Sequence, residues 1–549
     1  MPLQKNQVLT LQVERLSSDG SGVAHSPEGE TVFIPGAAPG DEARVRIVKD
    51  CKRYAFGILD EVLTPSPDRI PVDCAVAGPC GGCSLRHLDY AAELRAKQEN
   101  VADAFAHIGG LDVPVLPIVG SPEIDRYRNK VQFPVGTDKA GRPCIGFYAG
   151  RTHRIVPCPD CRLQPGVLNE IGNTLCAFFA EKGIHPYNEE TGKGLVRHIF
   201  LRRGAHSGQI MVCLVCTRAK LPSADELCTR LKEAFPDIVT ILLNVNAKNT
   251  NVILGSETHT LYGQGYIEDT LCGVPVQLGP LSFYQVNTLA AEQLYGIAAE
   301  YAQLTPDDLL LDLYCGMGTI GLSMADHCRE LVGVEIVPEA IESAKANAAR
   351  MGTAVSAKSR FFCADAGQAA AQLAADGLHP DVVMLDPPRK GCDEATLSAV
   401  VRMAPRRVVY VSCNPATAAR DAAWLEQNGY HAEKVQPVDL FPRTKHVEMV
   451  VLLSKGEVDS KKIRVEFSLE DMDMSEFQDG ATYTQIKDYV LEHSGLKVSN
   501  LYISQIKRKC GIEVGKNYNL PKSEDSRQPQ CPPEKEKAIR EAMKYFGMI

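Results

Sequence analysis

LLLDLYCGMGTIG, at residues 309–321, is the stretch that decides the fold. An apolar run leads into a Gly-rich turn and then into a helical pattern, and such a turn lets the backbone approach a bound nucleoside closely. Gly316, Gly318 and Gly321 satisfy G-x-G-x-x-G, a string that also fits nicotinamide and flavin sites and occurs by chance. The stretch predicts a nucleoside-binding turn at the carboxyl edge of a parallel sheet.

Acidic residues around this turn favour S-adenosylmethionine over a dinucleotide as the ligand. Asp312 lies inside the strand before the turn, and Glu335 ends the next strand, where a carboxylate can accept hydrogen bonds from two ribose hydroxyls. Asp365, after the third strand, stands where an adenine contact is expected. Gly316 and Gly318 would let the backbone approach the ligand.

The surrounding sequence predicts a Rossmann-like domain over residues 281–455. Apolar strand runs alternate there with helical segments, as in repeated βαβ units, so a mostly parallel, doubly wound sheet is expected. Residues 1–64 alternate apolar and polar positions between turn signals, which predicts a small OB-like β-barrel. Residues 65–280 read as a mixed α/β domain whose helix 91–108 could pack with the catalytic domain, and residues 456–549 as a small, mainly helical extension of unknown role.

Bulk properties limit the class of protein. No run approaches the roughly 18 apolar residues of a membrane span, and the N-terminus lacks a secretory pattern, so a cytoplasmic protein is expected. The net charge of -9 excludes indiscriminate coating of nucleic acid, and any RNA contact must be local. The candidate basic patches are Arg44, Arg46, Lys49, Lys52 and Arg53; Arg126, Arg128 and Lys130; and Arg197, His198, Arg202 and Arg203.

Two strand ends carry reactive side chains. LDPPRKG places Asp386 after one strand, and VSCNP places Cys413 after the next, so both should face one crevice. Uracil C5 is too weak a nucleophile to accept a methyl group unaided. A thiolate that adds to C6 makes C5 a carbanion equivalent, and a general base must later remove the C5 proton. Glu448 and His446 both stand near the last strand, and their spacing alone does not choose between them.

Several motifs, in order, resemble the RNA uracil-5-methyltransferase family over residues 1 to about 454. They are SFYQVN (282–287), DLYCGMGTIG (312–321), LDPPRKG (385–391), VSCNPAT (411–417) and HVEMVV (446–451), extended by YRNKVQF (127–133) and GLVRHIFLR (194–202). The resemblance implies that the barrel is a TRAM domain, that Cys413 is the nucleophile and that Glu448 is the base. It also implies that Gln285, Tyr314, Glu335 and Asp386 bind S-adenosylmethionine. Thr319 stands where the family often has Asn.

A cysteine cluster in DCAVAGPCGGC predicts a metal site. Cys74, Cys80 and Cys83 could share a centre with a fourth thiolate, and their spacing alone leaves zinc and iron open. The resemblance implies a 4Fe-4S cluster with Cys161 as the fourth ligand and Cys158 as its competitor.

The resemblance also implies a substrate. Family members that carry both barrel and cluster are similar to 23S ribosomal RNA enzymes, so methylation of a uridine in 23S RNA by a monomeric enzyme is expected. A transfer RNA substrate is the alternative, as is an amino methyltransferase that uses the Asp-Pro-Pro loop without a thiol. Which uridine is modified does not follow from the sequence.

Overall fold

The computed structural model describes residues 3–150, 152–248, 250–456, 483–494, 496, 498–510 and 531–545. The chain divides into two compact units, Met1–Asp459 and Ser460–Ile549. Across these described ranges, no helix has the length and apolar character that a membrane span requires.

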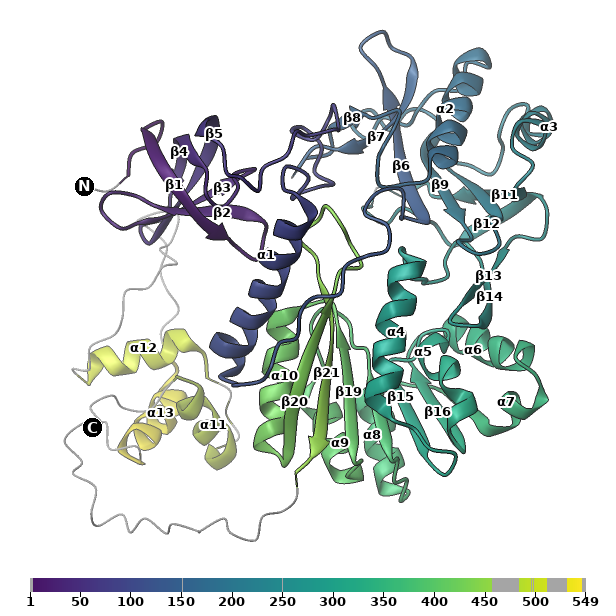
Figure 1. Ribbon diagram of the computed structural model, residues 1–549. Helices are drawn as coiled ribbons and strands as arrows, with labels where there is room; N and C mark the ends of the chain where they lie inside the picture. Colours follow the sequence, from purple (N-terminus) through teal and green to yellow (C-terminus); the bar gives the residue numbers. More distant parts are fainter. Residues whose placement is uncertain are drawn as a thin grey trace. The chain divides into compact units, whose positions relative to one another are not determined.

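The N-terminal barrel predicted from the sequence is present as a closed five-stranded barrel (Figure 1). Its strand order is β1-β2-β3-β5-β4, and only the β3–β5 pair is parallel. Aliphatic residues such as Val32, Ile34 and Val45 point inward and form the core. The strands are β1 (Val8–Leu16), β2 (Ser21–His25), β3 (Thr31–Pro35), β4 (Glu42–Asp50) and β5 (Tyr54–Thr64).

The middle region contains a second, mostly antiparallel sheet of seven strands in the order β12-β11-β10-β9-β6-β7-β8. β10 is buried along its whole length, and Cys213 and Cys216 lie within the hydrophobic core. The elements are β6 (Lys130–Thr137), β7 (Pro143–Tyr148), β8 (Ile155–Pro157), α2 (Gly166–Glu181), β9 (Val196–Arg203), β10 (Ile210–Cys216), α3 (Ala224–Ala234), β11 (Ile238–Val245) and β12 (Glu257–Tyr262).

The helix expected at 91–108 is α1 (Tyr90–Asp103), followed by a π-helical turn η1 (Ala104–Gly109). The Asp89 side chain caps α1 by accepting a hydrogen bond from the Ala92 N–H at 2.7 Å. Val101 and Phe105 are buried in the core of the C-terminal sheet, so α1 belongs to the surface of that sheet although it comes far earlier in the chain (Figure 1).

The C-terminal sheet of this unit has the order β17-β16-β15-β18-β19-β21-β20. β15 to β19 are parallel, and β20 and β21 complete the sheet in antiparallel pairs. This is the expected doubly wound arrangement, and the strand order reverses beside β15, where ligands of such sheets bind. The strands are β15 (Leu309–Leu313), β16 (Glu330–Glu335), β17 (Ser359–Cys363), β18 (Val382–Leu385), β19 (Arg407–Ser412), β20 (Tyr430–Val438) and β21 (Glu448–Lys455).

Helices cover both faces of this sheet (Figure 1). They are α4 (Thr288–Ala302), α5 (Thr319–Ser323), the 3-10 turn η2 (Ala325–His327), α6 (Pro338–Arg350), α7 (Thr353–Lys358), α8 (Ala366–Ala375), α9 (Glu394–Met403) and α10 (Pro415–Gln427).

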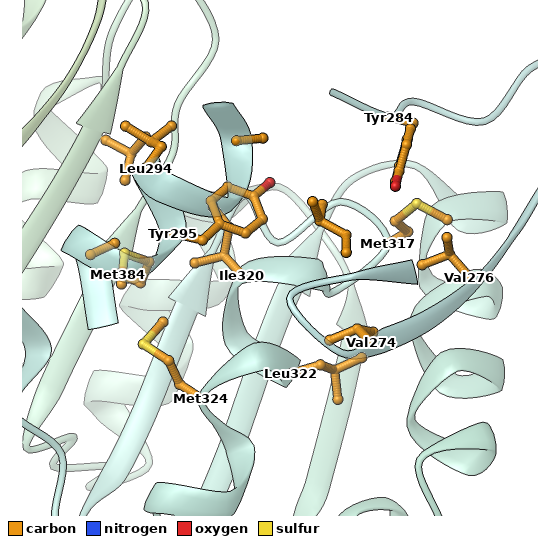
Figure 2. Packing of buried hydrophobic residues seen from close by; sticks show 14 of the residues in the cluster. Val274, Val276, Tyr284, Leu294, Tyr295, Met317, Ile320, Leu322, Met324 and Met384 are labelled. Atoms are coloured by element: carbon orange, nitrogen blue, oxygen red, sulfur yellow. The ribbon is translucent and has the colours of Figure 1, made fainter. Parts of the chain in front are cut away.

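A hydrophobic cluster includes residues of the Gly-rich turn (Figure 2). The hairpin β13 (Ile267–Leu271) and β14 (Val274–Leu278) contributes Val274 and Val276 to this cluster, and α4 contributes Leu294 and Tyr295. Met317 and Ile320 belong to the same cluster, so the turn and the start of α5 are held by packing.

The second unit is a small helical module, as expected for the C-terminal extension. α11 (Tyr483–Ser494), α12 (Asn500–Lys509) and α13 (Pro533–Tyr545) bury Ile486, Ile503 and Ile539 against one another. Residues 457–482, 511–530 and 546–549, which belong to the predicted extension, lie outside the described residues.

Candidate active site

The Gly-rich turn after β15 adopts backbone conformations that few residues tolerate. Gly316 and Gly318 have φ values of 55° and 79°, which glycine adopts without strain. Tyr314 has a φ of 66°, a costly conformation for an aromatic residue. Such strain persists only where surrounding structure enforces it, and it concentrates at ligand sites.

Glu335 is bound to the turn from the end of β16. Its carboxylate accepts hydrogen bonds from the N–H groups of Gly316 at 3.2 Å, Ile336 at 2.8 Å and Val337 at 3.0 Å. These contacts fix the carboxylate at the mouth of the turn, and its free lone pairs can accept further hydrogen bonds.

Asp312 is buried below the same turn. Its Oδ2 accepts a hydrogen bond from the Gly321 N–H at 3.0 Å, while Oδ1 has no hydrogen-bond partner in the described part of the chain. Burial raises the pKa of Asp312 to about 8, so the carboxyl is largely protonated at neutral pH. A Cβ at position 321 would lie 2.8 Å from Asp312 Oδ2, and this close approach requires glycine there.

Asp365 has a local structural role. It is the N-cap of α8, and its Oδ1 accepts hydrogen bonds from Gly367 N–H at 3.1 Å and Gln368 N–H at 3.2 Å. This capping places the carboxyl at the end of the loop after β17, and an adenine contact would add to that structural role.

Gln285 lies in a segment that the middle region holds in place. Its backbone carbonyl accepts a hydrogen bond from Asn129 Nδ2 at 2.8 Å, and the same amide donates to Thr288 Oγ1 at 2.9 Å. The Gln285 side chain lies beside the hydroxyl of Tyr295 on α4. Asn129, in the YRNKVQF motif (127–133), therefore supports the loop that carries Gln285.

Cys413, Glu448 and Asp386 come together at the edge of the sheet. Asp386 follows β18, Cys413 follows β19, and Glu448 begins β21, which is hydrogen-bonded to β19. Burial raises the pKa of the Cys413 thiol above its usual value, and the Glu448 carboxylate adds to that increase. The Arg389 guanidinium hydrogen-bonds the thiol and lowers its pKa, which opposes the effects of burial and of Glu448.

Both carboxyl groups hold their protons more tightly than usual. Burial raises the pKa of Asp386 to about 7, and it raises the pKa of Glu448 well above its usual value. Asp386 raises the pKa of Glu448 further, because two nearby carboxylates repel each other.

Arg389 was not singled out from the sequence, although it lies in LDPPRKG. Its backbone carbonyl accepts a hydrogen bond from Asn414 Nδ2 at 2.8 Å, which ties the Asp386 loop to the residue after Cys413. Its guanidinium donates to His446 Nδ1 at 3.2 Å. Burial lowers the pKa of His446 to about 4, so this ring is neutral at physiological pH.

Glu448 lies in the last strand, whereas His446 lies before it. β21 begins at Glu448, and the polar loop before it carries His446. The two side chains are therefore not held in one strand register.

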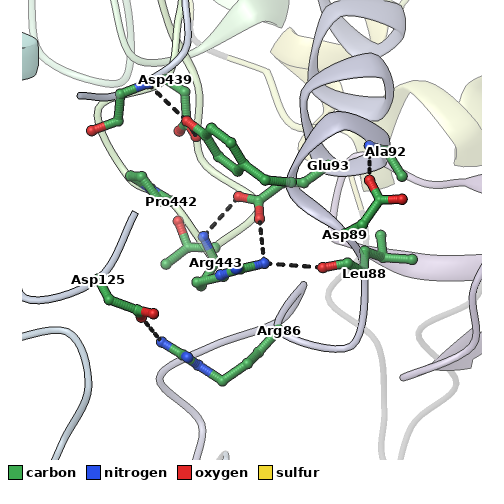
Figure 3. Close-up of polar contacts among 12 residues, drawn as sticks. Arg86, Leu88, Asp89, Ala92, Glu93, Asp125, Asp439, Pro442 and Arg443 are labelled. Carbon is green, nitrogen blue, oxygen red and sulfur yellow. Dashed lines mark hydrogen bonds and ion pairs between the residues drawn. The ribbon is translucent and has the colours of Figure 1, made fainter. Parts of the chain in front are cut away.

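A buried charge network supports that loop (Figure 3). Lys97 of α1 donates to Glu93 at 2.7 Å and to Asp439 at 2.8 Å, and all three side chains are buried. The Arg443 N–H donates to Glu93 at 2.7 Å, and the Arg443 guanidinium donates to the Leu88 carbonyl at 3.0 Å. α1 thereby holds the segment that leads to His446 and Glu448.

Five cysteines line one cavity of about 310 Å³ between the loop after β5 and the loop after β8: Cys74, Cys80, Cys83, Cys158 and Cys161. Arg86 lines the same cavity and hydrogen-bonds Cys83. Within the described ranges, no three or more His, Cys, Asp or Glu side chains form a group that could hold a metal ion as they stand. The thiols nevertheless line one cavity.

Many residues of the predicted basic patches have structural partners. Arg197 and Arg202 are buried and donate to backbone carbonyls, including those of Asn246 and Gly279. Arg44 and Arg46 pair with Glu61 and Asp60, both at 2.8 Å, and Arg126 pairs with Asp160 at 2.7 Å. Only part of the predicted cationic surface is therefore free to meet a ligand.

Comparisons with known proteins agree with this architecture. A family model described as tRNA (Uracil-5-)-methyltransferase matches residues 274–456, and a TRAM domain model matches residues 2–59. A protein of Halalkalibacterium halodurans named an RNA methyltransferase is 43% identical over 453 residues, which are 82% of this chain and 98% of that protein. One of Clostridium tetani is 41% identical over 454 residues, 83% and 98% of the two chains.

A solved structure resembles most of the chain. It is the Pyrococcus abyssi tRNA (uracil-54, C5)-methyltransferase in complex with S-adenosyl-L-homocysteine. Its sequence is 27% identical, its TM-score is 0.65, and the match covers 81% of this chain and 100% of that one.

Proposed function

The chain belongs to the RNA uracil-5-methyltransferase family, and from this premise we propose that it methylates C5 of a uridine in RNA through a covalent bond between Cys413 and C6. S-adenosylmethionine is the methyl donor. The observation that supports this mechanism most directly is the meeting of Cys413, Glu448 and Arg389 at one sheet edge, beside the Gly-rich turn.

The Cys413 thiolate adds to C6, and the electrons of the C5–C6 double bond move to C5, with the developing charge delocalised onto the O4 oxygen. C5 attacks the sulfonium methyl group, and S-adenosylhomocysteine leaves. Glu448 then takes the C5 proton, the double bond reforms, and the thiolate is expelled.

Local residues tune this chemistry. Arg389 favours the thiolate of Cys413, which burial alone would disfavour. Glu448 is the better candidate for the base because Nδ1 of His446 already faces the Arg389 guanidinium. A raised pKa also makes the Glu448 carboxylate a stronger base than an exposed carboxylate.

S-adenosylmethionine would lie along the turn after β15. We assign Glu335 to the ribose hydroxyls, because its carboxylate is already fixed at the mouth of the turn. Gly316 and Gly318 would allow close backbone approach. Further contacts are proposed for Gln285, Tyr314, Asp365 and Asp386.

A covalent trap tests the mechanism. RNA with 5-fluorouridine should form an adduct that survives denaturant, because fluorine cannot leave C5 as a proton does. Cys413→Ala should abolish the adduct, while Cys228→Ala, a matched change on α3, should not. Glu448→Gln should accumulate methylated RNA still bound to the protein. Normal turnover by Cys413→Ala would favour an amino methyltransferase and exclude this mechanism.

Two RNA substrates remain as candidates. The combination of barrel and cysteine cluster favours 23S ribosomal RNA in the cytoplasm. The Pyrococcus abyssi enzyme, named for uracil-54 of transfer RNA, supports transfer RNA as the second candidate. Mapping 5-methyluridine in both RNA classes, from cells with and without the protein, distinguishes them.

We further propose that Cys74, Cys80, Cys83 and Cys161 hold a 4Fe-4S cluster, with Cys158 as the competing ligand. A four-iron cluster is larger than one ion, so thiols spread around a cavity of about 310 Å³ suit it better than zinc. Because methyl transfer requires no electron, the role proposed for the cluster is structural. It would anchor the loop that carries its cysteine ligands.

Iron and sulfide content test this assignment. Cys83→Ser should lower both and remove the visible absorption, whereas Cys144→Ser on β7 should leave them unchanged. Comparing Cys158→Ser with Cys161→Ser identifies the fourth ligand. A purified protein with stoichiometric zinc and no iron would contradict the proposal.

A further inference from the structure

The N-terminal barrel places its aromatic residues on the outside. Residues 1–64 contain three aromatic residues, Phe33, Tyr54 and Phe56, and none belongs to the barrel core, which is aliphatic. Tyr54 is 41% exposed, and the other two are half-buried. Folding normally buries such side chains because each removes a large apolar area from water.

Strand β5 reverses the usual distribution of side-chain size. Over Tyr54–Ile58 the inward positions carry the small residues Ala55 and Gly57, while Tyr54, Phe56 and Ile58 point outward; Leu59 is the next residue that packs against the core. A Cβ added to Gly57 would lie 2.3 Å from Val45 Cγ1, so the core beneath is already filled. The large outward residues therefore do not compensate for a gap inside the barrel.

The three rings form one continuous surface. Phe33 of β3 lies directly across from Phe56 in the parallel pairing, and their ring centroids are 5.8 Å apart. Tyr54 forms T-shaped pairs with both rings, with centroids 5.8 Å from Phe33 and 5.6 Å from Phe56. Because Tyr54 is 41% exposed, part of its ring remains accessible to a base.

Cations border this aromatic surface. Lys49 of β4 lies across from Phe56, and Lys52 and Arg53 occupy the turn that leads into Tyr54. All three are exposed, and throughout the described ranges none of them forms an ion pair, unlike Arg44 and Arg46 on the same strand. Unpaired cations attract phosphates, and exposed rings stack on bases.

We propose that Phe33, Tyr54 and Phe56 form a stacking platform for unpaired bases of the RNA substrate, with Lys49, Lys52 and Arg53 binding the adjoining phosphates. The inference rests on the proposed function, because it assigns a second RNA contact to the same enzyme. The platform holds single-stranded RNA flanking the target and reads no base edge, so it tolerates any sequence.

Oligoadenylate is the probe that separates this site from the catalytic crevice, since it contains no uridine. The full-length chain should bind fluorescent 12-nucleotide oligoadenylate, as measured by anisotropy. Tyr54→Ala should weaken that binding by about 5- to 150-fold, the usual range for loss of one base–aromatic stack. Tyr54→Phe should retain it, and so should Leu63→Ala, an exposed apolar control on β5.

The salt dependence of oligoadenylate binding tests the proposed phosphate contacts of the cations. Lys52→Ala should lower the slope of log affinity against log salt by about 0.7, as expected for one lost phosphate contact on a single strand. Ultraviolet crosslinking should join the oligonucleotide to the peptide that contains Tyr54.

Two results would overturn the platform: no binding of oligoadenylate by the wild-type chain, or Tyr54→Ala affinity equal to wild type. A surface for a protein partner would give the second result. The 5-fluorouridine adduct of the wild-type chain is read separately, so a failed platform and a failed methyltransferase mechanism are distinguishable.

Discussion

At the scale of single residues, Arg389 links the two halves of the reacting site. It hydrogen-bonds Cys413, contacts His446, and its loop is tied to Asn414. The guanidinium is the main group that offsets the effect of burial on the thiol. Nucleophilicity at neutral pH should therefore depend on this side chain.

Arg389→Leu should raise the pKa of Cys413 further and move the pH profile of adduct formation to higher pH. At pH values below the pKa of Cys413, the rate of adduct formation should fall by roughly tenfold or more, because the thiolate loses one hydrogen bond from a charged group. Rapid mixing with 5-fluorouridine RNA at about pH 6 to 9 measures this. Lys390→Leu, an exposed cation next in sequence, is the control. A profile identical to wild type would exclude the role.

Asp312 makes stability depend on pH. Burial raises the pKa of Asp312 from 3.8 to about 8, so the folded chain keeps a proton that the unfolded chain releases across that interval. Since the unfolded state then binds fewer protons, the free energy of unfolding should fall as pH rises from about 4 to 8.

Asp312→Asn resembles the protonated carboxyl and should flatten this dependence. At about pH 8 it should stabilise the catalytic domain by roughly 1 kcal/mol or more, as urea unfolding would show. Asp326→Asn, on an exposed turn, is the control because its carboxyl is hydrated in both states. Parallel pH curves for Asp312→Asn and wild type would contradict the prediction.

At the scale of elements, α1 reaches across the chain to hold the loop before β21. Lys97 neutralises Glu93 and Asp439 inside the protein. Lys97→Met should leave two buried carboxyl groups without their cation and cost about 3–5 kcal/mol of stability. Hydrogen exchange over residues 439–446 should increase.

Lys345→Met gives the comparison for this network. Lys345 forms an exposed ion pair with Glu342 at 2.9 Å, and its loss should cost at most about 0.5 kcal/mol. Equal unfolding curves for the two variants would mean that the buried network does not hold the loop.

Local patterns predicted the elements because side-chain periodicity is a local property. The barrel, the doubly wound sheet and the C-terminal helices followed from it, and Asp386 and Cys413 were placed together because parallel strands end at one edge. Lys97 and Asp439 are 342 residues apart, and no periodicity predicts such a pair. The π-helical end of α1 and the outward rings of β5 likewise depend on packing between elements.

At the scale of the whole molecule, the net charge of -9 does not show how the charged groups are distributed between the domains. The sheet edge of residues 309–448 holds buried acids and a thiol beside the exposed Lys390, whereas Lys49, Lys52 and Arg53 border exposed aromatic rings on the barrel. RNA should therefore meet the protein first through the barrel, and its uridine must leave the stack to reach Cys413.

The helical module at the C-terminus should be dispensable for methyl transfer. Relatives such as the Halalkalibacterium halodurans protein align over 98% of their own length with 82% of this chain, and residues 460–549 form a separate compact unit. A chain ending at Gly456, after β21, keeps Cys413, Glu448, Arg389 and the residues of the turn after β15. It should form the 5-fluorouridine adduct at a rate within about twofold of the full chain, because each domain buries its own core. Loss of the adduct with an unchanged melting transition would instead assign the module a part in binding RNA.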